Sequence, residues 1–402
     1  IYEIKKRRRY LMIPLMKNAF LNEYETKKQL AEFILRAERL SMDQKCFEFE
    51  REFAKHQGRK HAILFNSGGS ANLALLQACK NLGILESGDL VGFSALTWST
   101  NTMPIIQMGL VPVPIDCKVE TLNVMSHNLE EKLQTVNLKA LFITNVLGFT
   151  GDLGKIKKIC DERGILLLED NCESLGSKLK EGKAGNFSLG STFSFFVAHH
   201  MSTIEGGAIC TDDNDLAEML KIVRANGWDR NLTTEQQKKW RKKFDIRDEF
   251  QAKYTFYDLG FNLRPTEITG FLGLNQLKHL DSTIKKREEN YIHLEAVVED
   301  NDEIFTLDRT HLSLLSSFAI PVICKTPSLR QKYLSQFSGA GVEIRPIIAG
   351  NIQSQPFYKK YVEKEYPLPN TDFIRDCGFY CGNYPELTES ELETLKGCLS
   401  KY

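Results

Sequence analysis

The sequence has no excess of either charge and no long apolar run. Its 402 residues carry 52 Lys and Arg against 52 Asp and Glu, so the formal net charge at pH 7 is zero. A protein that binds nucleic acid through its overall charge would have a basic excess. No apolar stretch approaches the roughly 18 residues that a membrane-spanning helix requires. We therefore expect neither a nucleic-acid partner nor a membrane-embedded chain.

Cysteine is too sparse for a disulfide framework. Ten cysteines are scattered through the chain, and most lie in apolar runs, as buried free thiols do. Because free thiols are typical of a reducing compartment, we expect a cytoplasmic protein. A hydrophobic content of 42% and a charged content of 26% are ordinary for a globular protein. The length predicts two lobes rather than one simple core.

Short apolar runs alternate with helical patterns between residues 62 and 212. A run such as Ile165–Glu169 (ILLLE) is apolar at every position but the last, which is typical of a strand buried on both faces. We therefore predict a three-layer α/β fold in which helices cover both faces of a mostly parallel sheet. Ligands of such folds bind beyond the carboxyl ends of the strands.

The same pattern divides the chain into segments. We predict a large domain over residues 12–277 and a smaller α+β lobe over residues 278–402, which includes a strand at residues 343–348. The basic residues 1–11 are interpreted as a leader outside the fold. Residues 237–253 are dense in charge and poor in apolar side chains, so we expect an exposed excursion between strands.

Two glycines open a helix directly after the first predicted strand. The motif NSGGSAN places Gly68 and Gly69 where the backbone can approach a ligand closely. The N-terminus of a helix also offers unpaired N–H groups to an anion. The segment is either a phosphate cradle or a simple turn, and the motif alone does not choose between them.

Acidic, aromatic and imidazole side chains follow other strands. Asp170 ends the most apolar strand, where a carboxylate is costly to bury unless it is paired, although it could instead cap a helix. Trp98 either stacks on a flat ligand or packs in the core. His199 and His200 are adjacent, so their side chains point apart, and with no third ligand nearby we expect acid–base chemistry rather than a metal site. Together these groups suit a flat, phosphorylated heterocycle that can be protonated.

Several motifs, taken in order, resemble those of one family. The chain is similar to the DegT-type nucleotide-sugar aminotransferases, pyridoxal-phosphate enzymes of fold type I, in the segments NSGGSAN, LLLEDNCES, TFSFF…EGGA, RANGWDRN, GFNLRPTEITGFLGLNQL and GVEIRPIIAGN. The resemblance extends from about Leu15 to Tyr402. It implies pyridoxal 5′-phosphate or pyridoxamine 5′-phosphate as the cofactor, and a homodimer with active sites built across two subunits.

One position departs from most of that family. Six residues before Glu205, where most members carry the Schiff-base lysine, this chain has His199, as the lysine-less sugar 3-dehydratases do. The resemblance implies that His199 is the catalytic base and acid, and it implies no metal. The implied cofactor-binding residues are Gly68, Gly69, Trp98, Asp170, Glu173, Ser194 and, from the partner subunit, Asn262. The implied substrate-binding residues are Arg230, Glu343, Arg345 and Asn351.

The implied reaction is a dehydration at C3 of a sugar. A nucleotide-linked 4-keto-6-deoxy hexose would become a 4-keto-3,6-dideoxy sugar, with L-glutamate as the amino donor to the cofactor. The nucleotide and the stereochemistry of the hexose are not fixed by these residues.

Two alternatives stay open. The first is an iron–sulfur dehydrase that needs a partner reductase, but its relatives carry cluster cysteines soon after the EGG segment. This chain has no cysteine between Cys210 and Cys324, which favours the cluster-free enzyme. The second is a protein that binds the cofactor or a nucleotide sugar without turnover. The presence of Asp170 together with Glu173 and Trp98 argues against it, because a pure binding protein does not need an electron sink.

Overall fold

A seven-stranded sheet lies at the centre of the molecule. The computed structural model describes residues 13–401, so the predicted leader at residues 1–11 lies outside the described residues. The strand order is β1-β8-β7-β5-β4-β2-β3. The strands are β1 (His61–Phe65), β2 (Leu90–Ser94), β3 (Val111–Ile115), β4 (Ala140–Thr144), β5 (Leu166–Asp170), β7 (Gly190–Ser194) and β8 (Gly207–Thr211). All are parallel except β8, which pairs antiparallel with β1 and β7. The predicted mostly parallel α/β fold is confirmed.

The two faces of the sheet carry separate apolar cores. Because side chains alternate along a strand, Ile63 and Phe65 of β1 pack on one face, and Ala62 and Leu64 pack on the other. The first face is covered by α4 (Gly68–Asn81), α5 (Ser99–Gln107) and α8 (Asn214–Arg224). The opposite face is covered by α3 (Gln44–Gln57), α6 (Ser126–Leu133), α7 (Leu153–Arg163) and α12 (Leu280–Glu299). These are the three predicted layers.

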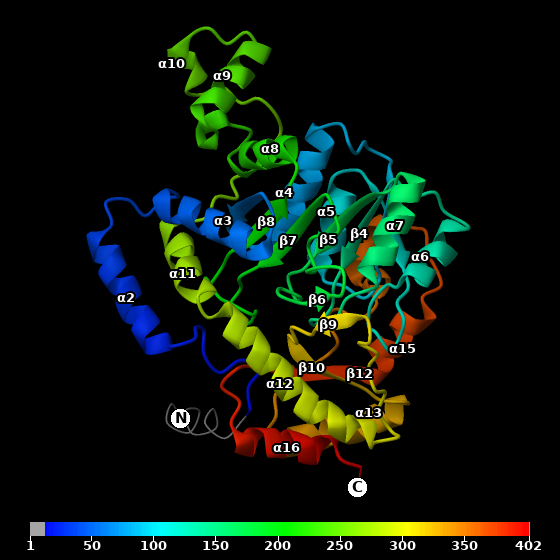
Figure 1. Cartoon of the computed structure of the whole chain (residues 1–402). Helices are drawn as coiled ribbons and strands as arrows, with labels where there is room; N and C mark the ends of the chain where they lie inside the picture. The colour runs from blue at the N-terminus through cyan, green and yellow to red at the C-terminus, as the bar shows by residue number, and fades with distance from the viewer. Residues whose placement is uncertain (1–12, 402) are drawn as a thin grey trace.

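A smaller lobe is built around a second sheet. Its order is β10-β12-β11, and both pairings are antiparallel. Its strands are β10 (Ala319–Ile323), β11 (Ile344–Arg345) and β12 (Gly378–Gly382), and its helices are α13 (Pro327–Gly339), α15 (Pro369–Cys377) and α16 (Glu389–Leu399). The short helix α14 (Pro356–Tyr361) packs instead on the large sheet, where Tyr358 contacts Phe93 of β2. The long helix α12 runs from the large sheet toward α16 (Figure 1).

The first described residues contact this smaller lobe. Ile13 bridges to Val342, and the backbone N–H of Leu15 donates to Glu343. The division between residues 277 and 278 stays a prediction. The remaining elements are α2 (Glu23–Arg36), α9 (Thr234–Lys243), α10 (Glu249–Ala252), α11 (Glu267–Leu277), β6 (Lys178–Leu179), β9 (Leu312–Leu314), η1 (Asp229–Asn231) and η2 (Ile352–Ser354). Within residues 13–401, no helix is both long and apolar enough to cross a membrane.

Two predicted elements differ from the structure. The strand expected at residues 343–348 is only Ile344–Arg345, because Pro346 follows and proline has no N–H to donate to a sheet. The charged stretch at residues 237–253 lies between helices α8 and α11, not between strands, and forms much of α9 and α10. Figure 1 shows these two helices projecting beyond α8. Trp240 anchors α9, since it is buried and donates to Glu218.

Candidate active site

The candidate residues lie where parallel strands of the large sheet end. β1 leads into Gly68 and Gly69, β2 into Trp98, and β5 and β7 end at Asp170 and Ser194. Because these strands are parallel, their carboxyl ends meet at one rim, as expected for a ligand site in such a sheet. β8 is antiparallel, so its first residues return to the same rim.

Gly68 and Ser194 form a close contact at this rim. A Cβ atom on Gly68 would lie 2.6 Å from Ser194 Cβ and 3.1 Å from Cys172 Sγ. Only glycine therefore lets the first turn of α4 come so near to the end of β7. The Ser67 hydroxyl accepts from the Ser70 N–H and caps the helix. The N–H groups of Gly68 and Gly69 are among those that a helix cannot satisfy by itself, so they are suited to an anion.

Asp170 is buried within a network of amide donors. It is 3% exposed; its Oδ2 accepts from Asn72 Nδ2 at 2.8 Å and from Asn101 Nδ2 at 2.6 Å. Its Oδ1 accepts from the Cys172 N–H at 2.8 Å. Thr192 in turn donates to Asn72. The alternative of a helix cap is not supported, because the segment after Asp170 is a turn.

Asn72 and Asn101 were missed by the sequence reasoning. Asn72 lies inside the NSGGSAN motif, one turn beyond the glycines, which could have identified it. Asn101 lies on α5 and has no local signal of its own. Both amides fix the orientation of the Asp170 carboxylate, and within residues 13–401 no Lys or Arg bonds to that carboxylate. A buried acid held in this way suits a cation supplied by a ligand.

Glu173 lies on the same turn and has a shifted pKa. Its Oε2 accepts from the Leu147 N–H at 3.0 Å. Burial raises the pKa of the Glu173 carboxyl to about 7, partly opposed by that hydrogen bond. At neutral pH this group therefore exists in both protonation states and is able to exchange a proton with a phenolic hydroxyl.

Trp98 is not part of the core. Its side chain is 56% exposed, so the alternative of core packing is excluded for the isolated chain. The loop before it is held by a hydrogen bond of 2.7 Å between Thr97 Oγ1 and Thr144 Oγ1. The indole is thus presented at the rim on a fixed backbone.

His199 lies on the loop that joins β7 to β8. Its ring packs against Phe318 with centroids 5.1 Å apart, and its Nδ1 is buried without a hydrogen-bond partner. Burial, and secondly the positive charge of Arg287, lower the pKa of His199 to about 3. The imidazole is therefore neutral at neutral pH. His200 points elsewhere, to the Ser316 carbonyl at 2.9 Å.

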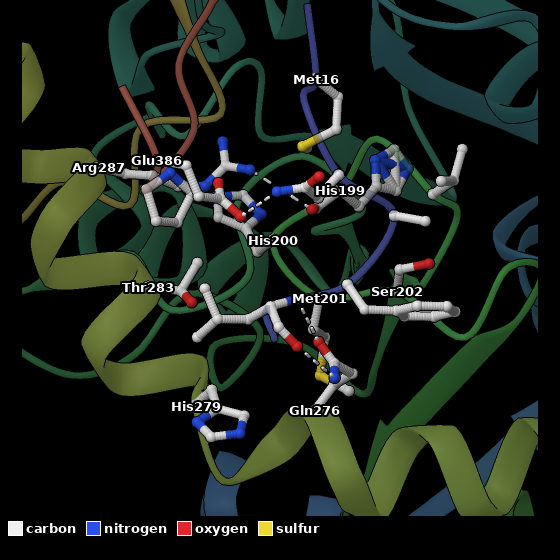
Figure 2. A pocket seen from close by; sticks show the side chains of 16 residues that line it. Met16, His199, His200, Met201, Ser202, Gln276, His279, Thr283, Arg287 and Glu386 are labelled. Carbon is white, nitrogen blue, oxygen red and sulfur yellow. Dashed lines mark hydrogen bonds between the residues drawn. The ribbon is translucent and has the colours of Figure 1, made fainter. Parts of the chain in front are cut away.

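A cavity lies beside the two histidines (Figure 2). Its lining includes Met16, His199, His200, Arg287 and Glu386. Asp170, Ser194 and Gly68 are absent from that lining. The cavity therefore lies next to the rim and is distinct from the glycine cradle.

No hydrogen bond among the described residues joins Asn262 or Arg230 to the cradle, although Leu263, next to Asn262, accepts from the Asn66 N–H at 3.0 Å just before it. Asn262 is exposed and bridges to Ala225. Arg230 is exposed and lies over the Trp228 ring at 5.3 Å. The structure of one chain brings neither residue to Asp170. Their implied roles stay predictions.

The three remaining substrate candidates already have partners. Arg345 Nη2 donates to Glu343 Oε1 at 2.5 Å, and Arg345 is exposed. Asn351 bridges to Leu96, near the end of β2, but its amide donates to Asp372 and its oxygen caps η2. Asn351 is therefore close to the rim with its polar atoms in use, and its role toward a substrate stays a prediction.

Metal-ligating side chains do not cluster in the described part of the chain. Among residues 13–401, no group of three His, Cys, Asp or Glu residues is arranged to hold a metal ion. The donor set at the rim consists instead of backbone N–H groups, one hydroxyl, one oriented carboxylate and one exposed indole.

The fold and this rim define the class of protein. A three-layer α/β/α domain with a smaller C-terminal lobe and a polar rim at the strand ends is the fold of the pyridoxal-phosphate-dependent aminotransferases. An *Escherichia coli* GDP-4-keto-6-deoxy-D-mannose 3-dehydratase, solved with bound hydrated pyridoxal phosphate, superimposes with a TM-score of 0.89 at 30% identity, covering 97% of this chain and 100% of that one. A GDP-4-keto-6-deoxymannose 3-dehydratase with a trapped pyridoxal-phosphate–glutamate geminal diamine gives a TM-score of 0.88 at 30% identity, covering 96% of this chain and 100% of that one.

Sequence comparison gives the family. The model of the DegT/DnrJ/EryC1/StrS aminotransferase family matches residues 22–400, and this chain belongs to that family. A GDP-4-keto-6-deoxy-D-mannose 3-dehydratase from Escherichia coli O55:H7 is 32% identical over 370 residues, which cover 91% of this chain and 94% of the relative. The resemblance inferred from the motifs is confirmed.

Proposed function

We propose that this protein is a pyridoxal-phosphate-dependent sugar 3-dehydratase. Its substrate is a nucleotide-linked 4-keto-6-deoxy hexose, and its product is a 4-keto-3,6-dideoxy sugar. The relatives named above favour GDP-4-keto-6-deoxy-D-mannose as the substrate to test first. The observation that carries the proposal is the loop at residues 195–206, which contains two histidines and no lysine, beside a rim whose buried carboxylate has no cationic side chain bonded to it.

The residues of the rim fit the cofactor. The close approach of Gly68 to Ser194, which a Cβ would block, leaves backbone N–H groups and a hydroxyl for a phosphate. Asp170, fixed by two asparagines, would hold the protonated ring nitrogen. Trp98 would cover the ring face and Glu173 would lie at the ring hydroxyl. Asn262 would contact the phosphate from the partner of a homodimer, which its exposure in the single chain supports.

Pyridoxal phosphate, when bound, supplies an electron sink. The chain supplies the proton transfers and the binding groups. His199 serves first as a base and then as the acid that protonates the departing C3 hydroxyl, which one imidazole can do in sequence. Arg230, Glu343, Arg345 and Asn351 are the groups we propose for the substrate. Overall, L-glutamate becomes 2-oxoglutarate and ammonia, so its two electrons replace the C3 oxygen of the sugar by hydrogen and no reductase is required.

A histidine at this position changes the outcome of the reaction. A lysine would bind the cofactor covalently and return a proton in a way that gives an amino sugar. Histidine forms no stable bond of that kind, so the hold on the cofactor rests on the glycine cradle, Asp170 and Trp98. We place the enzyme in the reducing cytoplasm, which the ten free cysteines support.

One reaction mixture tests this function. Purified protein, pyridoxal phosphate and L-glutamate are incubated with GDP-, CDP-, dTDP- and UDP-linked 4-keto-6-deoxy sugars, and products are identified by mass spectrometry. We expect a product that lacks one oxygen, formed only with glutamate and without a reductase.

Other products would contradict the proposal in distinct ways. A product that carries an amino group would make the protein an aminotransferase. Formation of 2-oxoglutarate without any sugar product, together with iron in anaerobically purified protein, would favour the reductase-dependent dehydrase. Binding of pyridoxal phosphate without 2-oxoglutarate would favour a protein without turnover.

A further inference from the structure

Arg287 is a buried cation with an unusual set of partners. It lies on α12 and is 1% exposed. Its guanidinium donates to the backbone carbonyls of Phe318 at 2.9 Å, Ser317 at 3.4 Å and Asn383. No Asp or Glu within residues 13–401 is hydrogen-bonded to it, and its Nε is buried without a partner. A buried charge held by carbonyls alone is costly, so its position calls for a functional reason.

The fourth carbonyl that Arg287 reaches belongs to His199. Arg287 Nη2 donates to the His199 oxygen across 3.5 Å. The ring of Phe318, whose carbonyl Arg287 also binds, packs on the His199 imidazole with an interplanar angle of 60°. One guanidinium therefore fixes both the backbone of the histidine and the aromatic ring that its imidazole rests against.

A polar network keeps Arg287 itself in place. Asn383 donates from its amide to the Arg287 carbonyl at 2.9 Å and to Ser317 Oγ at 3.0 Å. Asn290, one turn along α12, donates to Asn383 Oδ1 at 3.2 Å. Ser317, Phe318 and Asn383 belong to the C-terminal lobe, whereas His199 belongs to the large domain. The guanidinium therefore connects the two parts of the molecule at the histidine.

Few other titratable groups face His199. The cavity beside it contains His200 from the same loop, His279 and Arg287 from α12 and its N-cap, and Glu386 after β12 (Figure 2). Burial lowers the pKa of Arg287, and the negative charge of Glu386 partly opposes this. The Glu386 carboxylate also accepts a hydrogen bond from Asn18 Nδ2 at 3.3 Å. Among the residues of this lining, Arg287 is the only Lys or Arg, and a second positive charge on His199 would be repelled by it.

We propose that Arg287 is a positioning residue for His199: its guanidinium holds the histidine loop and Phe318 in register and places a positive charge next to the histidine. This inference rests on the proposed role of His199 as base. It makes α12 part of the machinery of the reaction, although Arg287 itself touches neither the cradle nor Asp170.

The test is a titration of the histidines in the cofactor-loaded protein. Protein labelled with ¹⁵N-histidine is followed by NMR as a function of pH, with the His199 signals identified by their loss in His199→Asn. In Arg287→Met we expect the midpoint of His199 to rise by about one pH unit or more, because a neighbouring positive charge has gone. Lys286→Met is the matched control: it removes the same charge from the adjacent, half-exposed position on α12 and should leave the midpoint unchanged.

A second variant separates geometry from charge. Arg287→Lys keeps the positive charge but cannot span four carbonyls, so we expect an unchanged His199 titration with dehydration slowed about tenfold or more. A folded Arg287→Met protein with the wild-type titration, or Arg287→Lys with the wild-type rate, would overturn the proposal. If Arg287→Met does not fold, the rate of Arg287→Lys decides.

The titration does not depend on turnover. If wild-type protein dehydrates none of the sugars offered, the proposed function fails while the effect of Arg287 on His199 is still measured. If the sugar reacts normally and the titration is unchanged in Arg287→Met, only the inference about Arg287 fails.

Discussion

Replacement of Gly68 by alanine tests the glycine cradle at a single methyl group. The added Cβ would lie 2.6 Å from Ser194 Cβ and 3.0 Å from its Oγ, whereas ordinary van der Waals contact begins at 3.4 Å. Ser194 is restrained, because it pairs with Gly207 of β8 and because β7 also pairs with β5 as far as Thr192. The first turn of α4 must therefore move by roughly 0.8 Å, which is the difference between the 3.4 Å of ordinary contact and the 2.6 Å to Ser194 Cβ. The N–H groups of that turn move with it.

The energetic cost can be stated as a range. Overpacking a buried contact by one methyl group costs about 1–3 kcal/mol. If the bound form bears that strain, the dissociation constant for pyridoxal phosphate rises between about fivefold and a hundredfold, because 1.4 kcal/mol is a factor of ten.

Equilibrium dialysis with pyridoxal phosphate measures this effect. Gly69→Ala is the matched control, because the only contact of its Cβ shorter than 3.4 Å would be with the methyl group of Thr100, at 3.0 Å, which is able to rotate away. We expect Gly69→Ala to bind within about threefold of wild type. Equal dissociation constants for wild type and a folded Gly68→Ala protein would show that the reasoning about the cradle is wrong.

Four further variants follow from the site. Burial raises the pKa of Glu173 to about 7, so folding favours the protonated acid, and this stabilisation is lost as pH rises through that value. The Tm of Glu173→Gln should therefore increase relative to the wild-type Tm as pH rises from 5 to 8. A Tm difference that stays constant over this range would contradict the raised pKa. Glu169 is fully buried and accepts two backbone N–H bonds, at 2.8 and 3.0 Å; Glu169→Gln should lose about 1–3 kcal/mol of stability, read as a lower Tm, and an unchanged Tm is the adverse result. His199→Lys should abolish dehydration in the mass-spectrometric assay, and a wild-type rate would rule out the assigned role. If active sites span a dimer, hybrids of His199→Asn with Asn262→Ala subunits should regain activity that both parent homodimers lack, whereas inactive hybrids would count against the shared site.

Local patterns predicted the elements of the fold well. The helix Glu389–Leu399 begins at a capping box of Thr388 and Glu391, which is a start signal that the sequence displays locally. The strand at residues 343–348 was predicted too long, since a single proline outweighed the apolar pattern. The excursion at residues 237–253 was placed between strands because its anchoring contacts, from Trp240 to Glu218 and from Arg241 to Asp229, are not visible in local sequence.

The site was predictable only where a motif carries it. Gly68 and Asp170 each follow a strand, so the parallel topology brings them to one rim. Asn101 and Arg287 reach the site from helices distant in sequence, and nothing in their neighbourhoods indicates which residues they face. The two histidines were also visible in the sequence, and the family resemblance selected His199 from them, but it could not show that a buried arginine lies behind that histidine.

The pairing of Ser194 with Gly207 has a consequence for how the activity of this fold can evolve. The loop that carries residue 199 leaves β7 and re-enters the neighbouring strand β8 directly opposite its point of departure. Both ends of the loop are thus tied to each other through the sheet, and its length and path are set independently of the side chain at its tip. An exchange of lysine and histidine there leaves the strand register and both cores untouched. One substitution can therefore change the chemistry of the site while the pairing of the two strands is kept, which makes this loop a natural point for new activities to arise.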